Sequence, residues 1–519
     1  MLIKNKIIRD TVMLTALQLF LDSSSLLLNA FITRRLGTSA MGILSLTGSF
    51  LVLAGTVSNG NAFLCMSRLI SEELGKSRRN PNRVLAYGLV LCTMLSTAVS
   101  IALLGFSDII GIKFLKSEAM SKAVRLMPLA LIPGAFSACF KGYFNAMRSA
   151  KITAAGDILE FAVKSAVIAA LTVGAKSSSD GSVCTMMICG IVSGACCSLV
   201  YFLIMFVKFH GVYGSKPSIS FGKYISLAIP IMLGSVITSA LSSTNDALIP
   251  ITLRQYGDSV SEALGSFGIF EAIVIPTIFF PSVVLCSMSG IIVSEAARAS
   301  ASGNKTRIKS ISEKLIEATL IFAFFAAAVL MKFGCEIGEL LGGGQLAGKI
   351  ISIIAPVVPF IYLEIVLEAL IKGLGLQGFS SLNYFIEYAV RISIVLIFVP
   401  KFGFYGIVAS YYASNVIGNC SRVIKILRHT GVKLRPIKSV IMPIVYVFLT
   451  MNAAELLLRI FGIGTKSIPG MIIFALIWGV GYTAIFLFEK DIIVSIPKST
   501  LKSRSSFVKN KQKRKAIVL

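Results

Sequence analysis

The stretch Glu160-Phe-Ala-Val-Lys164 recurs, with conservative changes, as Glu387-Tyr-Ala-Val-Arg391. Each copy places an acid and a base about one helical turn apart, inside a stretch that is apolar enough to cross a membrane. A charge at bilayer depth costs about 2.5 to 3.5 kcal/mol on insertion scales. Two matched pairs about 227 residues apart therefore indicate a duplicated unit with a polar interior, which is typical of proteins that move a substrate across a membrane.

The composition excludes a soluble globular protein. Of the 519 residues, 55% are hydrophobic and only 14% are charged, and the mean hydropathy is +0.84. The net charge of +26 would suggest nucleic acid in a soluble chain, but Lys and Arg cluster here in short segments between apolar runs, as topology signals do. We therefore predict a multi-pass membrane protein that binds no nucleic acid.

Runs of about 20 apolar residues predict about fourteen transmembrane helices. The longest polar segments between them are rich in Lys and Arg, so the positive-inside rule places them in the cytoplasm. Alternation from a basic N-terminus then puts the basic tail Lys498–Lys515 on the same side, so both termini are predicted to be cytoplasmic. The predicted spans are 9–33, 41–66, 84–106, 121–145, 152–175, 183–207, 224–248, 266–293, 315–332, 348–372, 380–399, 404–427, 438–462 and 468–488.

The duplication extends beyond the two opening motifs. A pair of prolines precedes Lys141-Gly142 in one copy and Lys372-Gly373 in the other, and Arg34 with Gly37 parallels Arg254 with Gly257. Six helices per copy is an even number, so both copies insert with the same orientation. We predict an all-α polytopic membrane protein in which two six-helix lobes, related by a parallel repeat, enclose a central cavity. The predicted parts are a first lobe (1–208), a cytoplasmic linker (209–223), a second lobe (224–428), two extra C-terminal helices (438–488) and a basic cytoplasmic tail (489–519).

Several acidic side chains lie inside the apolar spans and are predicted to face protein or water. Glu364 and Glu368 lie on one helical face, where two like charges repel unless a cation, a proton or a basic partner such as Lys372 is near. Asp246, beside Asn245, and Glu271 have no helical partner of opposite sign. The candidates for coupling to H+ or Na+ are Asp22, Asp246, Glu271, Glu364 and Glu368.

The repeated pairs leave two interpretations open. Glu160 with Lys164, and Glu387 with Arg391, can form intrahelical ion pairs that only stabilise the two helices. Alternatively, their bases can contact an anionic substrate in the cavity. The candidate substrate contacts are Lys164, Arg391, Lys372 and Asn245.

Enzyme, metal and cofactor chemistry are disfavoured. The two histidines, His210 and His429, both lie in predicted cytoplasmic segments, so no histidine-based catalytic or metal cluster can be assembled at membrane depth. The ten cysteines lie almost all in apolar runs without a Cys-x-x-Cys motif, and are interpreted as small packing residues. No nucleotide site is evident, so active transport would draw on an ion gradient, the membrane potential or a downhill substrate.

Three motifs carry a resemblance to a known family: Arg35-Leu-Gly-Thr-Ser-Ala-Met-Gly42, Ser67-Arg-Leu-Ile-Ser-Glu-Glu73 and Lys141-Gly-Tyr-Phe-Asn145. The chain resembles the multidrug/oligosaccharidyl-lipid/polysaccharide exporter superfamily, and within it the polysaccharide-biosynthesis branch that includes the stage V sporulation protein B group and the lipid II flippases. The resemblance covers nearly the whole chain.

This resemblance implies alternating access of two lobes and translocation of an undecaprenyl-linked sugar headgroup. It also gives the two extra helices a purpose, as a groove for the lipid tail. The lipid II flippases carry several arginines in the cavity, whereas the first helix here offers Asp22 and the eighth offers Glu271. Lys164, Arg391 and Lys372 are then the remaining candidates to meet a pyrophosphate.

Three functions follow as hypotheses. The first is a flippase for a lipid-linked oligosaccharide, a precursor of polysaccharide or peptidoglycan, in the bacterial cytoplasmic membrane, with membrane lipids and envelope-synthesis proteins as partners. The second is an ion-coupled exporter of cationic drugs or metabolites, indicated by the excess of acids in the spans. The third is a non-transporting scaffold in envelope or spore assembly. The sequence identifies neither the sugar nor the coupling ion.

Overall fold

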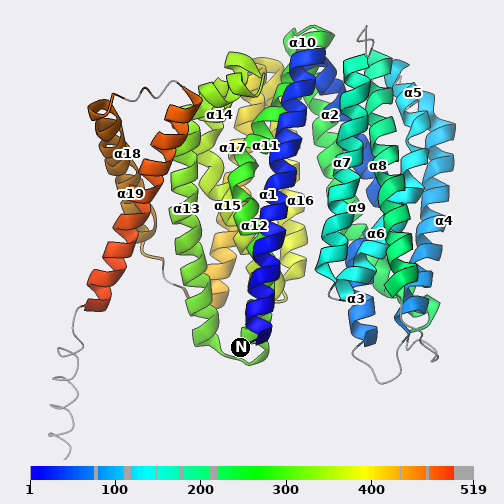
Figure 1. Cartoon of the computed structure of the whole chain (residues 1–519), viewed down its shortest axis with the longest axis horizontal. Helices are drawn as coiled ribbons and strands as arrows, with labels where there is room; N and C mark the ends of the chain where they lie inside the picture. The colour runs from blue at the N-terminus through cyan, green and yellow to red at the C-terminus, as the bar shows by residue number, and fades with distance from the viewer. Residues whose placement is uncertain are drawn as a thin grey trace, which may run out of the picture. The chain divides into compact units, whose positions relative to one another are not determined.

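The computed structural model describes residues 2–74, 80–109, 118–147, 149–174, 180–209, 219–432, 434–462, 464 and 467–495. Within these residues every regular element is a helix (Figure 1). Most of the predicted linker and almost all of the predicted tail lie outside the described residues.

The helices follow one another through short connections. Four predicted spans are each built from two or more consecutive α-helices, and two of these contain a π-helical or 3-10 turn between their helices. The elements are α1 (Leu2–Leu36), α2 (Thr38–Asn59), α3 (Ala62–Leu74), α4 (Pro81–Asp108), α5 (Glu118–Leu126), α6 (Pro128–Ala146), α7 (Ala150–Gly174), α8 (Asp180–Phe209), α9 (Phe221–Tyr256), α10 (Val260–Ile269), η2 (Phe270–Val274), α11 (Ile275–Phe279), η3 (Phe280–Ser282), α12 (Val283–Ala301), α13 (Lys305–Leu340), α14 (Gly344–Ile354), η4 (Ala355–Val357), α15 (Val358–Gly373), α16 (Gln377–Phe402), α17 (Phe404–Thr430), η5 (Ile437–Ile441), α18 (Met442–Ile460) and α19 (Ile468–Ser495).

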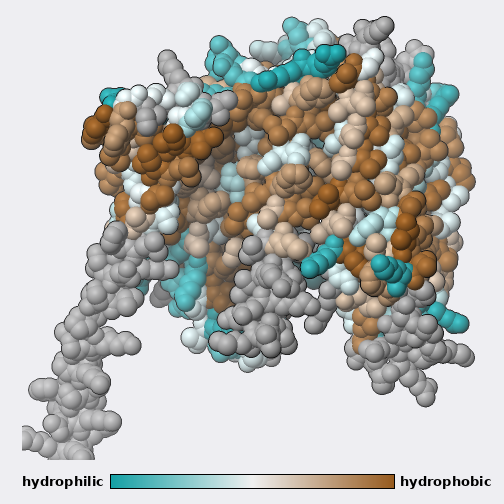
Figure 2. All heavy atoms as spheres, in the orientation of Figure 1, coloured by the Kyte–Doolittle hydropathy of each residue, from teal (hydrophilic) through white to brown (hydrophobic). Residues whose placement is uncertain are grey.

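The predicted spans are confirmed as helices, because each lies on one helix or on one run of consecutive helices. Among the described residues, 11 helical segments are long and apolar enough to cross a membrane. The segments of α6, α7 and α17 do not meet this criterion of length and apolar composition. They carry charged or amide side chains at membrane depth, such as Lys141, Glu160 and Arg422. Figure 2 shows apolar side chains over most of the visible face of the helices and hydrophilic ones along the end where α10 lies.

Prolines break two of the long spans. Pro276 and Pro281 follow the π-helical turn η2 in the run from α10 to α12, and Pro356 lies in the 3-10 turn η4 between α14 and α15. A proline removes a backbone donor and clashes with the preceding turn, so the helix kinks there. The span that contains Glu271 is therefore irregular at the position of that acid.

The chain divides into two compact units. One unit comprises Met1–Thr319 and Leu330–Lys433, and so contains the first predicted lobe and all of the second except residues 320–329. The other comprises Leu320–Val329 and Leu434–Leu519, and its α18 and α19 pack together. Within this second unit the Trp478 indole donates to the Val447 carbonyl at 3.1 Å.

The first helix of each predicted lobe also contacts the other lobe. α1 packs against α2 and α7 of its own lobe and against α12. α9 packs against α16 of its own lobe and against α2 and α4. Tyr224 near the start of α9 is buried in the core of the first lobe, in a cluster with Met66 and Tyr143. Residues from both predicted lobes therefore meet along α1, α2 and α9.

α2 and α10 approach each other closely through glycines. A Cβ on Gly42 of α2 would lie 1.9 Å from the Leu264 carbonyl oxygen, and one on Gly268 would lie 2.4 Å from the Gly42 nitrogen. The absence of side chains thus brings two backbones into direct contact, as in close helix pairs of membrane proteins.

Replacing Gly42 by Ala is expected to destabilise the protein by about 1 to 3 kcal/mol, because the added methyl group overlaps the backbone of α10. Gly55 of the same helix is the matched control, since a Cβ there meets nothing within 4 Å. Gly55→Ala should be neutral or stabilising by up to about 1 kcal/mol. Thermal unfolding of the two purified variants in detergent measures both changes in stability. Equal midpoints for the two variants would contradict the close α2–α10 packing.

Candidate functional site

A polar cavity of about 270 Å³ lies within the second predicted lobe. It is enclosed by α9, the irregular span from η2 to α11, α15, α16 and α17. Both charged and aromatic side chains face it. Its lining residues are Ser242, Asn245, Asp246, Glu271, Ile275, Phe279, Ile361, Glu364, Tyr384, Glu387, Tyr388, Arg391, Tyr411 and Asn415.

Arg422 of α17 holds three of the acids together. Its side chain is fully buried. Nη1 lies 3.0 Å from Oε2 of Glu387, Nη2 lies 3.3 Å from Oε1 of Glu364, and Nε lies 3.5 Å from Oε2 of Glu368. The guanidinium also lies 4.6 Å from the centre of the Tyr384 ring, within range of a cation–π contact. One buried base therefore compensates acids from α15 and α16.

Arg391 forms a second basic point on the cavity wall. Its Nη2 lies 3.4 Å from Oε1 of Glu387, and its Nε donates to the Ser414 hydroxyl at 3.0 Å. The guanidinium lies over the rings of Tyr411, at 4.4 Å, and Tyr388, at 5.3 Å. The predicted pair Glu387 and Arg391 is thus present, and the Arg422 contact makes it part of a larger network.

Asp246 and Glu271 are differently placed, because no ion pair within the described part of the chain joins either of them to a base. They line the same cavity, where two ionised carboxylates repel each other. Asp246 accepts hydrogen bonds from Ser49 and, at 3.3 Å, from the Asn245 amide. Glu271 lies in the π-helical turn η2, a feature often found at functional sites. Two neighbouring carboxylates without a paired base form a site suited to a proton or a small cation.

The corresponding charges in the first predicted lobe pair differently from the sequence interpretation. Lys141 of α6 pairs with Asp157 and, at 3.7 Å, with Glu160, both on α7. Glu160 is therefore engaged by a neighbouring helix rather than by Lys164. The Lys164 ammonium instead lies 5.4 Å from the centre of the Phe161 ring. The two copies of the motif share a sequence but not an ion-pairing pattern.

The other predicted residues lie outside the cavity wall. Glu368 is buried behind the cavity, where it accepts a hydrogen bond from Ser380. Lys372 is half-exposed and lies 3.4 Å from Glu368. Asp22 accepts a hydrogen bond from Gln18 at 2.8 Å. The structure thus brings Asn245, Asp246, Glu271, Glu364, Glu387 and Arg391 to one cavity, and leaves Asp22, Glu160 and Lys164 elsewhere.

Arg422 is the functional residue that the sequence interpretation missed. It falls near the end of a predicted span, where a base is usually taken for a topology signal. Asn415, Asn419 and Arg422 are spaced four and three residues apart and so share one helical face. All three are buried. Polar residues at this helical spacing inside an apolar span are the sequence pattern that could have identified Arg422.

Two arginines at the end of α1 cap the C-terminal ends of other helices. Arg34 donates to the Leu340 carbonyl at the end of α13, and Arg35 donates to the Val173 carbonyl near the end of α7. Cations are favourable at helix C-termini, where carbonyl groups lack intrahelical partners. These contacts explain why bases occur at this end of the molecule.

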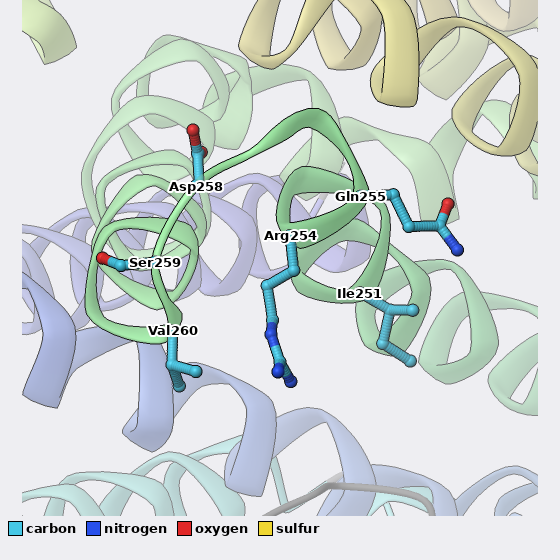
Figure 3. A pocket seen from close by; sticks show the side chains of 6 residues that line it. All are labelled: Ile251, Arg254, Gln255, Asp258, Ser259 and Val260. Carbon is cyan, nitrogen blue, oxygen red and sulfur yellow. The ribbon is translucent and has the colours of Figure 1, made fainter.

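A second, more open cavity of about 390 Å³ lies at the turn between α9 and α10 (Figure 3). Arg254 and Asp258 line it, and the guanidinium of Arg254 points away from the Asp258 carboxylate. Burial and the nearby charge of Glu262 raise the pKa of Asp258. Among the described residues, no group of three or more His, Cys, Asp and Glu side chains is arranged to hold a metal ion.

Comparison with known proteins supports the resemblance inferred from the motifs. The MatE family model matches residues 15–171. The stage V sporulation protein B of Bacillus subtilis (strain 168) is 19% identical over 420 residues, which cover 78% of this chain and 80% of that protein.

Two solved structures share the fold. A multidrug resistance MATE family transporter of the MOP superfamily, in an inward-facing conformation, matches 80% of this chain and 96% of its own, with a TM-score of 0.65 at 13% identity. The lipid II flippase MurJ, in an inward closed conformation, matches 93% of this chain and 100% of its own, with a TM-score of 0.66 at 14% identity. The predicted fold class, an all-α polytopic membrane protein, is confirmed.

Proposed function

We propose that this chain, a membrane transporter of the multidrug/oligosaccharidyl-lipid/polysaccharide exporter superfamily, flips a lipid-linked oligosaccharide across the bacterial cytoplasmic membrane by alternating access. Both termini would then lie in the cytoplasm. The first predicted lobe would contact the anionic headgroup, and the second would bind the coupling cation.

The observation that carries the proposal is that the ammonium of Lys164 has no ion-paired acid within the described residues. It lies at membrane depth on α7, and Glu160, the acid one turn before it, is engaged by Lys141. No acid within the described residues lies at ion-pair distance from its ammonium. An ammonium without an acid at ion-pair distance is costly inside a membrane protein, and a pyrophosphate supplies a charge that would stabilise it.

Two similarities support this substrate class. One relative is named a stage V sporulation protein and one structural neighbour a lipid II flippase. The chain also has α18 and α19 beyond the duplicated unit, which are available for a lipid tail. We place Arg391 and Lys372 as weaker candidates for headgroup contact, because Glu387 and Glu368 already pair with them.

Replacing Lys164 by Gln is expected to reduce translocation of a lipid-linked sugar in proteoliposomes at least tenfold, because a charge-assisted contact to phosphate is lost. Lys151→Gln is the matched control, since Lys151 is an exposed lysine at the start of the same helix. It should leave translocation within about twofold of the wild type. Unchanged translocation in the Lys164 variant, at equal expression, would reject this residue as a headgroup contact.

The second candidate function is export of a cationic compound. The observation that favours it is the acid excess of the cavity, where Asp246, Glu271, Glu364 and Glu387 face a single lining base, Arg391. A cationic dye would then be extruded by cells that carry the protein. Asp246→Asn should abolish that extrusion and Lys164→Gln should leave it intact, whereas a flippase should lose its activity in the Lys164 variant.

A further inference from the structure

Two side chains of the first predicted lobe reach the unpaired acids of the second. Ser49 of α2 donates a hydrogen bond to Oδ2 of Asp246 on α9. Asn29 of α1 donates to the carbonyl of Ala272, the residue after Glu271 in η2, at 3.0 Å. Each of the two acids is thus reached from the first lobe, Asp246 directly and Glu271 through the adjacent backbone.

The strength of the Ser49 contact depends on the charge of Asp246. A hydroxyl that donates to an ionised carboxylate makes a bond about twice as strong as one between neutral groups. A proton on Asp246 removes that charge, and a sodium ion bound at Oδ2 competes with the hydroxyl for the same oxygen. The contact between α2 and α9 is therefore strongest when the acid site is empty and ionised.

Two other hydrogen bonds connect the same region of α2 and α9, and their strength does not depend on the charge of Asp246. Ser239 of α9 donates to the Thr56 hydroxyl at 3.1 Å. The amide of Asn61, in the turn after α2, donates to the Ser235 hydroxyl at 2.7 Å. These bonds join neutral groups, so they hold the helices together whatever the state of the acids. Among the hydrogen bonds between the described residues of these two helices, the Ser49 bond is the one that a carboxylate accepts.

We propose that Ser49, assisted by Asn29, couples the occupancy of the Asp246–Glu271 site by a proton or a sodium ion to the separation of α2 from α9. This inference rests on the proposed function, which assigns the coupling cation to that site. Because coupling between two equilibria is reciprocal, separation of the helices must raise the affinity of the site for the cation by the same factor. Ser49 is thus a coupling residue and not a ligand of the transported substrate.

The charge state of Asp246 belongs to a group of neighbours, so a pH profile alone does not identify Ser49. Arg391 lines the same cavity as Asp246 and Glu271, so its charge acts on both acids. The titratable, charged and polar groups around Asp246 are Ser242 and Asn245 on α9, Glu271 in η2, Glu364 on α15, Glu387, Tyr388 and Arg391 on α16, Tyr411 on α17 and Ser49 on α2.

The test measures helix separation and cation binding on the full-length chain in lipid nanodiscs. Probes at the exposed positions Val173 of α7 and Tyr405 of α17, introduced as unnatural amino acids, report the distance between the lobes. The experiment is run in two ways: Na+ is added at fixed pH, or the pH is lowered without Na+. The comparison shows which of the two cations is effective. Calorimetry measures binding of the same cation independently of conformation.

In the wild type, the effective cation is expected to shift the ratio of separated to closed molecules about tenfold, the difference between a charge-assisted and a neutral hydrogen bond. Ser49→Val should reduce the shift to less than about twofold while calorimetric binding persists. Ser49→Thr, which is isosteric with valine but keeps the hydroxyl, should restore it. Ser239→Ala, which removes a neutral bond between the same helices, should respond like the wild type.

A Ser49→Val protein that binds the cation and shifts like the wild type would overturn the inference. A wild-type protein that binds neither cation would instead overturn the proposed coupling site, so the two failures are distinguishable. The Thr and Val variants differ by one hydroxyl at one position, so a folding defect common to both cannot imitate the expected difference.

Discussion

Replacing Arg422 by Met is expected to lower the free energy of unfolding by about 3 to 5 kcal/mol, because it leaves buried carboxylates without their compensating charge. Arg422 is fully buried and contacts Glu364, Glu368 and Glu387, which come from two other helices. Removing it exposes those acids to mutual repulsion at low dielectric. Denaturant unfolding of the reconstituted protein measures the effect.

A surface ion pair provides the control for this prediction. Arg459 lies 2.9 Å from Glu455 on α18, but its side chain is 76% exposed. Arg459→Met should cost less than about 1 kcal/mol, because water screens an exposed pair. Adding Glu364→Gln to Arg422→Met should recover part of the lost stability, because Arg422 is the one base in the described part of the chain that lies at ion-pair distance from Glu364. A loss no larger than that of the Arg459 variant would show that Arg422 does not hold the network together.

Replacing Glu271 by Gln is expected to reduce cation-driven transport about 10²-fold without a loss of stability. Glu271 lines the cavity, and no base among the residues that the structure describes forms an ion pair with it. The amide therefore removes the charge that would attract a cation and leaves none of those bases unpaired. Arg422→Met should behave differently, because its main expected effect is a loss of stability. Transport into proteoliposomes, driven by an imposed Na+ or pH gradient, measures the effect beside thermal unfolding.

Glu262→Gln is the matched control for this result. Glu262 is an exposed acid on the same span, where it completes a capping box with Ser259 at the start of α10. Glutamine also serves in that position of a capping box, so the helix end is retained. Gradient-driven transport should remain within about twofold of the wild type. If Glu271→Gln keeps the full gradient dependence, the coupling cation binds elsewhere.

The helical architecture could be predicted from the sequence because its signal is local. A run of apolar residues long enough to cross a bilayer must be helical, since every backbone group needs an internal partner in lipid. The duplicated motifs then indicated a two-lobe arrangement from the order of charged residues alone. The close contact between α2 and α10 was not predicted, because a glycine in a helix does not identify the helix that it meets.

The candidate site was predicted in part. The sequence singled out Asp246, Glu271 and Glu364 because isolated acids at membrane depth require an explanation. It did not predict that these acids share one cavity, which depends on the packing of α9, η2 and α15. Arg422 was missed because one base near the end of a span resembles a topology signal.

The sequence by itself determined that two similar acid–base motifs lie at membrane depth in an all-helical chain. Only the tertiary structure decided which charges pair. Glu387 contacts both Arg391 on its own helix and Arg422 on α17, whereas Glu160 contacts Lys141 on α6. The physical reason is that an ion pair in a low-dielectric interior depends on distance and burial. Those are properties of how helices pack, and identical spacing along two helices leaves them undetermined.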